Sequence, residues 1–221
     1  MVHTDRFDAL TNHLDSIRKR YPDRPLQGNV QHPGQGIDFS YGNLTDDGTL
    51  RRFHTASIGK QLTATAIFRM IEARQLELTT PIASLLPTET LDALFTYNGV
   101  DHRGRVTVEQ LLGHTSGVAD YFSGIADSRA PEPGRGGEHK HHRSRRRKFT
   151  DVVIAEPDRL WTPAELLSYS RDAQQPVAPP GERFHYSDTG YVLLGMIAEA
   201  IDGTSFGRVL ERRVFEPAGM T

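Results

Sequence analysis

Apolar residues recur at helical spacing near the start of the chain. Four of them are separated by three or four positions: Phe7, Leu10, Leu14 and Ile17. This is the spacing of one face of an amphipathic helix, so we predict a helix over residues 4–20. The helical spacing is absent from the next segment, residues 21–57, where short β-like runs alternate with Gly, Pro and Asp-Asp-Gly turn signals. This segment predicts a two-stranded meander at 27–31 and 36–44, and a third short strand near 50–54.

A helical pattern returns at Ser57 and continues to about Ala73. Its apolar residues form one wide face: Leu62, Ala66, Ile67, Met70 and Ile71. Farther along, the stretch from Tyr191 to Ala198 is apolar almost all round, which predicts a buried helix. We expect Gly203 to end that helix.

Capping signals mark the starts of other helices. Thr107 with Gln110 has the spacing of a capping box, and we expect Gly113 to end that short helix. A second box begins at Thr162, with Pro163 at the first helical position and Glu165 closing the box. After Gly203, Thr204 is in position to start the last helix.

Residues 127–151 differ in composition from the rest of the chain. The stretch has two prolines, three glycines and a basic run: Arg135, Lys140, Arg143, Arg145, Arg146, Arg147 and Lys148. Such a run could bind nucleic acid through its phosphates. The cluster of His139, His141 and His142 could bind a metal loosely. No aromatic residue interleaves with the basic run. We therefore expect a mobile, solvated insertion and no nucleic-acid partner.

Composition narrows the classes of protein. The chain has 221 residues, a formal net charge of -2 and 37% hydrophobic residues, which suits one large domain or two small ones. It has no cysteine, so disulfides, thiolate metal sites and a cysteine nucleophile are excluded. The first residues lack the apolar run of a signal peptide, and no later segment approaches a membrane span. We expect a cytoplasmic protein, or a periplasmic or secreted one if an upstream signal was removed.

Two Ser–x–x–Lys pairs are candidates for nucleophilic chemistry, namely Ser16 with Lys19 and Ser57 with Lys60. Positions i and i+3 share a face of a helix, so the lysine can reach the serine hydroxyl. A lysine desolvated near a helix start loses its proton more easily. The neutral amine can then act as general base for the serine.

The sequence around each pair separates the two. Ser16 and Lys19 lie in a basic stretch that is typical of a solvated surface helix. Ser57 follows a β-like run and opens an apolar helix in which Lys60 is the first charged residue. A serine at such a junction can combine an exposed hydroxyl with backbone N–H donors. The alternative for Ser57 is an ordinary helix cap.

Two further segments carry candidate chemistry. In "HYSD", Tyr186 can relay a proton if its phenol lies near a lysine ammonium. Alternatively, Tyr186 is a packing residue, and Ser187 or Asp188 caps the next helix. The segment "GHTSG" lacks the Gly–x–Ser–x–Gly order of a nucleophile elbow. We therefore expect His114 to be a hydrogen-bonding structural residue and not a triad histidine.

Three segments in this order resemble the serine β-lactamase and penicillin-binding protein superfamily: "SIGK", "LLGHTSGVADYF" and "PGERFHYSDTGYVLLGMIAEAI". The resemblance is to the class C-like branch of D-alanyl-D-alanine carboxypeptidases, D-amino-acid peptidases and esterases, over about residues 29–221. It implies an α/β (α+β) fold, in which an antiparallel sheet is flanked by helices beside an all-helical region. It also implies Ser57 as the acylated nucleophile, Lys60 as its base and Tyr186 as the proton shuttle.

The resemblance also has departures. Asp188 stands where many relatives have an asparagine that contacts substrate, and Ser187 is its neighbour in the expected substrate-binding segment. A third motif, Lys–Thr–Gly or His–x–Gly, is not found after Asp188. We therefore expect the C-terminal sheet strands and one oxyanion-hole donor to be missing, leaving the N–H of Ser57 as the other donor. Since losing one donor costs about 10²–10³ in rate, the expected enzyme is an impaired one.

The sequence thus predicts one partial β-lactamase-like domain over residues 1–221. Its helix and sheet strands occupy residues 1–56, and a mainly helical region occupies 57–221. The expected reaction is acyl transfer from a β-lactam, D-Ala-type peptide or ester, through an acyl-enzyme. No cofactor and no metal are implied. The alternative is a binding module that keeps the fold without turnover.

Overall fold

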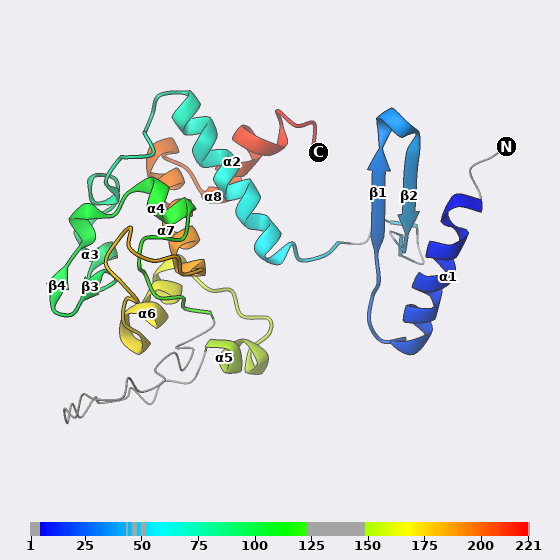
Figure 1. Cartoon of the computed structure of the whole chain (residues 1–221), viewed down its shortest axis with the longest axis horizontal. Helices are drawn as coiled ribbons and strands as arrows, with labels where there is room; N and C mark the ends of the chain where they lie inside the picture. The colour runs from blue at the N-terminus through cyan, green and yellow to red at the C-terminus, as the bar shows by residue number, and fades with distance from the viewer. Residues whose placement is uncertain (1–4, 43, 46–47, 50–51, 123–148, 221) are drawn as a thin grey trace. The chain divides into compact units, whose positions relative to one another are not determined.

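A computed structural model describes residues 5–42, 44–45, 48–49, 52–122 and 149–220. The chain divides into two compact units, Met1–Ala56 and Ser57–Thr221. Figure 1 labels their helices and strands. Most of the insertion predicted at 127–151 lies outside the described residues. Its last residues were assigned wrongly, because helix α5 (Phe149–Ala155) begins there and Phe149 is buried.

The described part of the first unit is one helix and one hairpin. Helix α1 (Asp5–Arg20) confirms the prediction for 4–20 within one residue. Strands β1 (Gly28–His32) and β2 (Ile37–Tyr41) pair antiparallel, with Val30 opposite Phe39. A short 3-10 turn, Pro33–Gln35, connects them. The two-stranded meander is therefore confirmed.

Side-chain contacts join this helix to its hairpin. The ring of Phe7 stacks on that of Phe39 with 4.9 Å between their centroids. The hydroxyl of Tyr41 donates a hydrogen bond to Asp15 at 2.7 Å. Both contacts use the same face of the hairpin, since Phe39 and Tyr41 are two residues apart on one strand.

The second strand ends at Tyr41 and does not reach residue 44 as predicted. Gly42 adopts a φ of +63°, and a side chain there would place its Cβ 2.2 Å from the carbonyl oxygen of Leu26. This left-handed turn redirects the chain away from the hairpin. Of the third strand predicted near 50–54, residues 50–51 lie outside the described part and residues 52–54 form no strand.

The second unit is mainly helical. After one 3-10 turn (Ala56–Ile58), α2 (Gly59–Glu72) replaces the single helix predicted from Ser57. Helix α7 (Asp188–Asp202) packs on α2 and on three other helices: α4 (Val108–Leu112), α6 (Pro163–Ala173) and α8 (Phe206–Leu210). Figure 1 shows them gathered around α7, drawn in orange.

The predicted burial of α7 is confirmed, because its apolar residues form the centre of the core. The fully buried members are Leu193, Leu194, Ile197 and Ala198. They pack with buried residues of α2, α4 and α8, among them Ile67, Leu111 and Val209. Burying a side chain of this size contributes about 1.5–3 kcal/mol, so the packing of α2 on α7 is strongly determined.

The two predicted capping boxes and the predicted end of α7 are confirmed. Thr107 and Gln110 form a complete box at α4, as do Thr162 and Glu165 at α6. Gly203 ends α7 with a φ of +63°. The last helix begins one residue later than predicted, since Ser205 and not Thr204 precedes α8.

Several short elements were not predicted. They are α3 (Thr88–Leu91), the hairpin of β3 (Thr96–Tyr97) with β4 (Val100–Asp101), the 3-10 turns Ile82–Ser84 and Arg103–Arg105, and a π-helical turn, Glu211–Phe215. Within the described residues no strand follows β4. No described helix is both long and apolar enough to cross a membrane. The predicted mixed α/β class is confirmed.

Candidate functional site

Ser57 lies in the 3-10 turn that leads into α2. The preceding residue, Ala56, adopts a φ of +46°, a left-handed conformation that is uncommon for residues other than glycine. The turn leaves Ser57 exposed at the start of the helix. The local backbone therefore presents the serine hydroxyl to solvent.

Lys60 and Tyr186 both reach the hydroxyl of Ser57. The Nζ of Lys60 donates to Ser57 Oγ at 3.3 Å, from one turn farther along α2. The hydroxyl of Tyr186 donates to the same oxygen at 2.9 Å, from the loop before α7. The packing of α2 on α7 thus brings together three residues that the sequence predicts as a catalytic group.

The other Ser–x–x–Lys pair makes no such arrangement. Ser16 lies on α1, where its hydroxyl donates to the backbone carbonyl of His13 at 2.6 Å. This is a local bond within one helix turn. It agrees with the prediction that Ser16 and Lys19 belong to a surface helix.

Asp188 forms an ion pair with Lys60. Both side chains are largely buried, with 17% of Lys60 and 19% of Asp188 exposed. Burial alone favours the neutral amine, but the hydrogen bonds with Asp188 and Tyr186 outweigh it and raise the pKa of Lys60 above its ordinary value. This direction is opposite to the one that a general-base lysine needs, and the role of Lys60 as a base stays a prediction. The sequence could not show that Asp188 lies against the amine.

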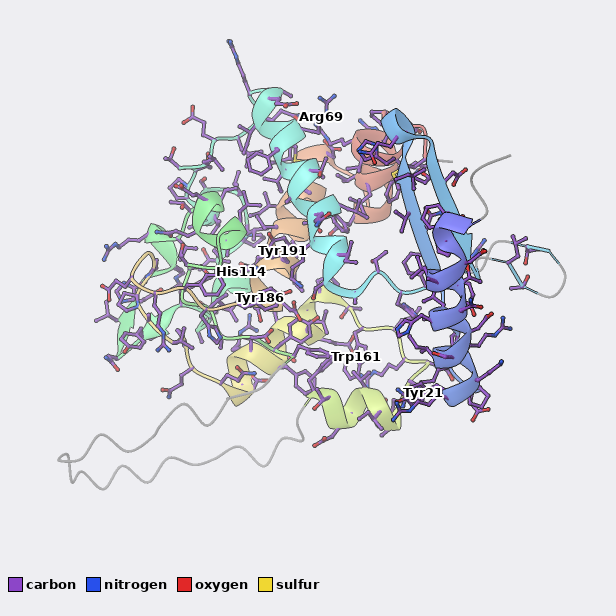
Figure 2. The ribbon with its side chains drawn as sticks, turned by 45° about the vertical axis from the view of Figure 1, so that its right-hand side comes forward. Tyr21, Arg69, His114, Trp161, Tyr186 and Tyr191 are labelled. Atoms are coloured by element: carbon purple, nitrogen blue, oxygen red, sulfur yellow. The ribbon has the colours of Figure 1, made fainter. Side chains whose placement is uncertain are left out.

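His114 packs against the same group. Its ring lies 4.4 Å from that of Tyr186 and 5.1 Å from that of Tyr191, measured between centroids. Figure 2 shows these three labelled rings close together beside α2. The Nδ1 of His114 accepts the backbone N–H of Ser187 at 3.1 Å. The predicted hydrogen-bonding role of His114 is thus seen, but its place beside Tyr186 was not foreseen.

Ser187 lies beneath the surface of the site. Only 2% of it is exposed, and its hydroxyl donates to the carbonyl of Ala119 at 3.2 Å. Its backbone has N-cap conformation, but its side chain makes no capping bond to α7. The N–H of Asp188 is instead bound by the carboxylate of buried Asp120, at 3.0 Å. Sequence reasoning missed Asp120, which holds the start of α7.

Backbone hydrogen bonds fix the loop that carries His114. The N–H of Val177 donates to Gly117, that of Gly181 to Thr115, and that of His185 to His114, at 2.9, 2.7 and 2.8 Å. The two segments of this loop lie so close that a Cβ on Gly117 would fall 2.0 Å from the carbonyl oxygen of Ala178. The segment before α7 is therefore held in place along its length.

These side chains surround an open hollow of about 470 Å³. Its lining is Ser57, Ile58, Lys60, Gln61, Ala64, His114, Tyr186 and Tyr191. Among the described residues no group of three His, Cys, Asp or Glu side chains could hold a metal ion. A hydroxyl, an amine and a phenol in mutual contact can perform acyl transfer.

The family model described as Beta-lactamase matches residues 38–221. The chain belongs to this family. All the residues of the hollow lie within the matched range.

Individual relatives agree with this assignment. The β-lactamase-family chain is 28% identical over 195 residues to penicillin-binding protein 4 of Amycolatopsis lactamdurans, covering 88% of the chain and 39% of that protein. A penicillin-binding protein structure from Bacillus halodurans superposes with a TM-score of 0.58 and 27% identity, over 94% of this chain and 54% of that one. The D-amino acid amidase of Ochrobactrum anthropi shares the fold, with a TM-score of 0.62 and 23% identity. The match covers 99% of this chain and 53% of that one. The chain thus spans well under half the length of penicillin-binding protein 4.

Proposed function

We propose that Ser57 is the acylated nucleophile of a serine hydrolase. The observation that carries the proposal is the convergence of Tyr186 and Lys60 on Ser57 Oγ, at 2.9 and 3.3 Å. Membership of the β-lactamase family and similarity to a penicillin-binding protein support it. The proposed substrates have a carbonyl carbon that can acylate the serine, namely a β-lactam, a D-Ala-type peptide or an ester.

Tyr186 is proposed as the proton relay. As Ser57 Oγ bonds to the carbonyl carbon, the phenol turns its O–H from Ser57 Oγ to the leaving group, and the phenol oxygen takes the serine proton. In the same step the phenolic proton passes to the nitrogen or oxygen of the leaving group, whose bond to the carbonyl carbon breaks. Water then attacks the acyl-enzyme, and the relay runs in reverse to restore the serine hydroxyl.

Lys60 is proposed to act through its charge. Because the pKa of Lys60 is raised, the amine carries its proton and cannot accept another from Ser57. An ammonium 3.3 Å from Ser57 Oγ stabilises negative charge that develops on the serine and phenol oxygens. The backbone N–H of Ser57 is proposed as one donor to the carbonyl oxygen of the bound substrate.

Asp188 is proposed to bind Lys60 and not the substrate, since its carboxylate is engaged in the ion pair. An acid at this position contributes no amide donor to a ligand. Ser187, with its hydroxyl on Ala119, is proposed to support the loop. With Asp188 and Ser187 engaged in this way, we expect low turnover, in keeping with the impaired enzyme that the sequence predicts.

The same ion pair favours a second candidate, a penicillin-recognition module without turnover. With Lys60 held by Asp188, binding could persist where proton transfer is slow. Acylation of Ser57 with slow release would indicate a slow enzyme, whereas reversible binding without acylation would indicate such a module.

The test is covalent labelling of the folded chain with a fluorescent penicillin and with a fluorophosphonate, followed by peptide mass spectrometry. We expect an adduct on Ser57 that Ser57→Ala abolishes and that the matched variant Ser16→Ala retains. Labelling at another residue, or equal labelling of Ser57→Ala, contradicts the proposal. A folded chain that binds penicillin reversibly without an adduct supports the binding module.

A further inference from the structure

His114 has a backbone conformation that calls for explanation. Its φ is +56°, in the left-handed region that residues other than glycine seldom occupy. Such a conformation persists where the surroundings fix it, and it is concentrated at functional sites. The residue before it, Gly113, has an ordinary φ of -86°, so the glycine does not take the strained position.

This conformation places the imidazole between α7 and the hollow. The Nδ1 atom accepts the N–H of Ser187 at 3.1 Å, and the ring packs on Tyr186. Nδ1 therefore carries no proton, so the neutral ring has its proton on Nε2. Figure 2 labels His114 and Tyr186 close together. The two contacts act on consecutive residues, the phenol that reaches Ser57 and the peptide that follows it.

We infer that His114 is a positioning residue, whose neutral imidazole holds the Tyr186 phenol on Ser57 by accepting the Ser187 N–H. This inference rests on the proposed function of Ser57. The hydrogen bond fixes the peptide that directly follows Tyr186, and so limits how far the phenol can move from the serine oxygen. A displacement of about 1 Å at a reacting group lowers the rate by up to about 10²-fold.

Protonation of His114 would turn its hydrogen bond with the Ser187 N–H into a repulsive contact. An imidazolium has N–H groups at both nitrogens, so Nδ1 would meet the Ser187 N–H donor to donor. Burial and the nearby Lys60 ammonium lower the pKa of His114, while Asp188 and Asp120 act in the opposite direction and His185 lowers it further. Tyr186 and Tyr191 are the other titratable groups against the ring. The positioning bond is therefore present above this lowered pKa and lost as the pH falls through it.

Two substitutions separate the acceptor from the ring. His114→Phe keeps an aromatic ring beside Tyr186 but removes the acceptor. His114→Asn removes the ring but offers a carbonyl oxygen near the place of Nδ1, and asparagine tolerates a positive φ. His32→Asn, at an exposed histidine on β1, is the matched control.

The rate of fluorophosphonate labelling at Ser57 is measured for the four chains across acidic and neutral pH. We expect His114→Phe to lower it at least about tenfold, and His114→Asn to restore it to within about threefold. The fall at acidic pH seen in the unmodified chain and in His32→Asn should be absent from His114→Asn. The inference is overturned if His114→Phe labels like the unmodified chain, or if His114→Asn is no better than His114→Phe.

A second measurement does not depend on reactivity. With ¹³C-labelled tyrosine, the Tyr186 Cζ signal should shift as His114 titrates, and His114→Asn should abolish that shift. If this coupling is seen but Ser57 never labels, positioning holds and the proposed function fails. If Ser57 labels, yet the Tyr186 signal ignores His114 and the asparagine rescues nothing, positioning fails while the proposed function stands.

Discussion

Lys60 and Asp188 form a largely buried ion pair beside Ser57. The two residues come from the N-terminal turns of α2 and α7, which pack against each other in the core. This pair favours the charged form of the lysine, because Asp188 and Tyr186 together outweigh the burial that would otherwise lower the pKa of Lys60. The sequence predicts Lys60 as a base, whereas the direction of this pKa shift favours the cation.

Replacement of Asp188 by asparagine tests this relationship. Lys60 then loses its anionic partner while its burial remains, so the pKa of Lys60 falls. Activity that needs the ammonium is lost as the pH rises through that pKa, and we expect the alkaline loss of Ser57 labelling to begin at lower pH. The free energy of unfolding at neutral pH should fall by about 1–2 kcal/mol. Asp158→Asn, at an exposed position on the loop before α6, is the matched control, and identical alkaline profiles would exclude the ion pair as their cause.

Tyr186→Phe removes the phenol oxygen that lies 2.9 Å from Ser57 Oγ. Because the ring and its packing on His114 remain, we expect little change in thermal stability. The labelling rate should fall about 10²–10⁴-fold, the usual contribution of a positioned proton-transfer group. Tyr97→Phe on β3 serves as the control. A labelling rate within threefold of the unmodified chain would remove Tyr186 from the relay.

Gly117→Ala should disturb the loop that carries His114. The position has a φ of +79°, and the added Cβ would lie 2.0 Å from the carbonyl oxygen of Ala178. We expect a loss of more than about 1 kcal/mol in the free energy of unfolding, measured in urea, together with slower labelling of Ser57. Gly104→Ala is the control, because nothing lies within 4 Å of its Cβ and its φ is not positive. Equal stability of the two variants would contradict the close approach.

The capping box of α6 predicts a pH effect. The backbone N–H of Thr162, the Thr162 hydroxyl and Arg159 lower the pKa of Glu165 from 4.5 to about 2. Its stabilising contribution is therefore complete above 4.5 and lost as the pH falls toward 2. Carboxyl ¹³C NMR should show this titration. Thr162→Ala should raise the pKa only in part, because the backbone N–H remains, and Thr65→Ala on α2 should leave the Glu165 signal unchanged.

Local signals in the sequence predicted the helix ends well. The boxes at Thr107 and Thr162 and the end of α7 at Gly203 are confirmed, because each depends on atoms within a few residues. The strand predicted to reach residue 44 failed for a tertiary reason, the close approach of Leu26 to Gly42. The short hairpin of β3 and β4 has only two residues in each strand, which is too few for an alternating pattern to reveal.

The sequence by itself determined the residue types of the site and the proximity of Ser57 to Lys60, since positions three apart in helical backbone share a face. It also determined the helices whose apolar faces must pack. Only the tertiary structure decided that Tyr186 reaches Ser57, that Asp188 lies against Lys60 and that His114 supports the loop between them. Those contacts join residues up to 129 positions apart. They also fix protonation, because the charge of a lysine depends on its partners and its burial in space.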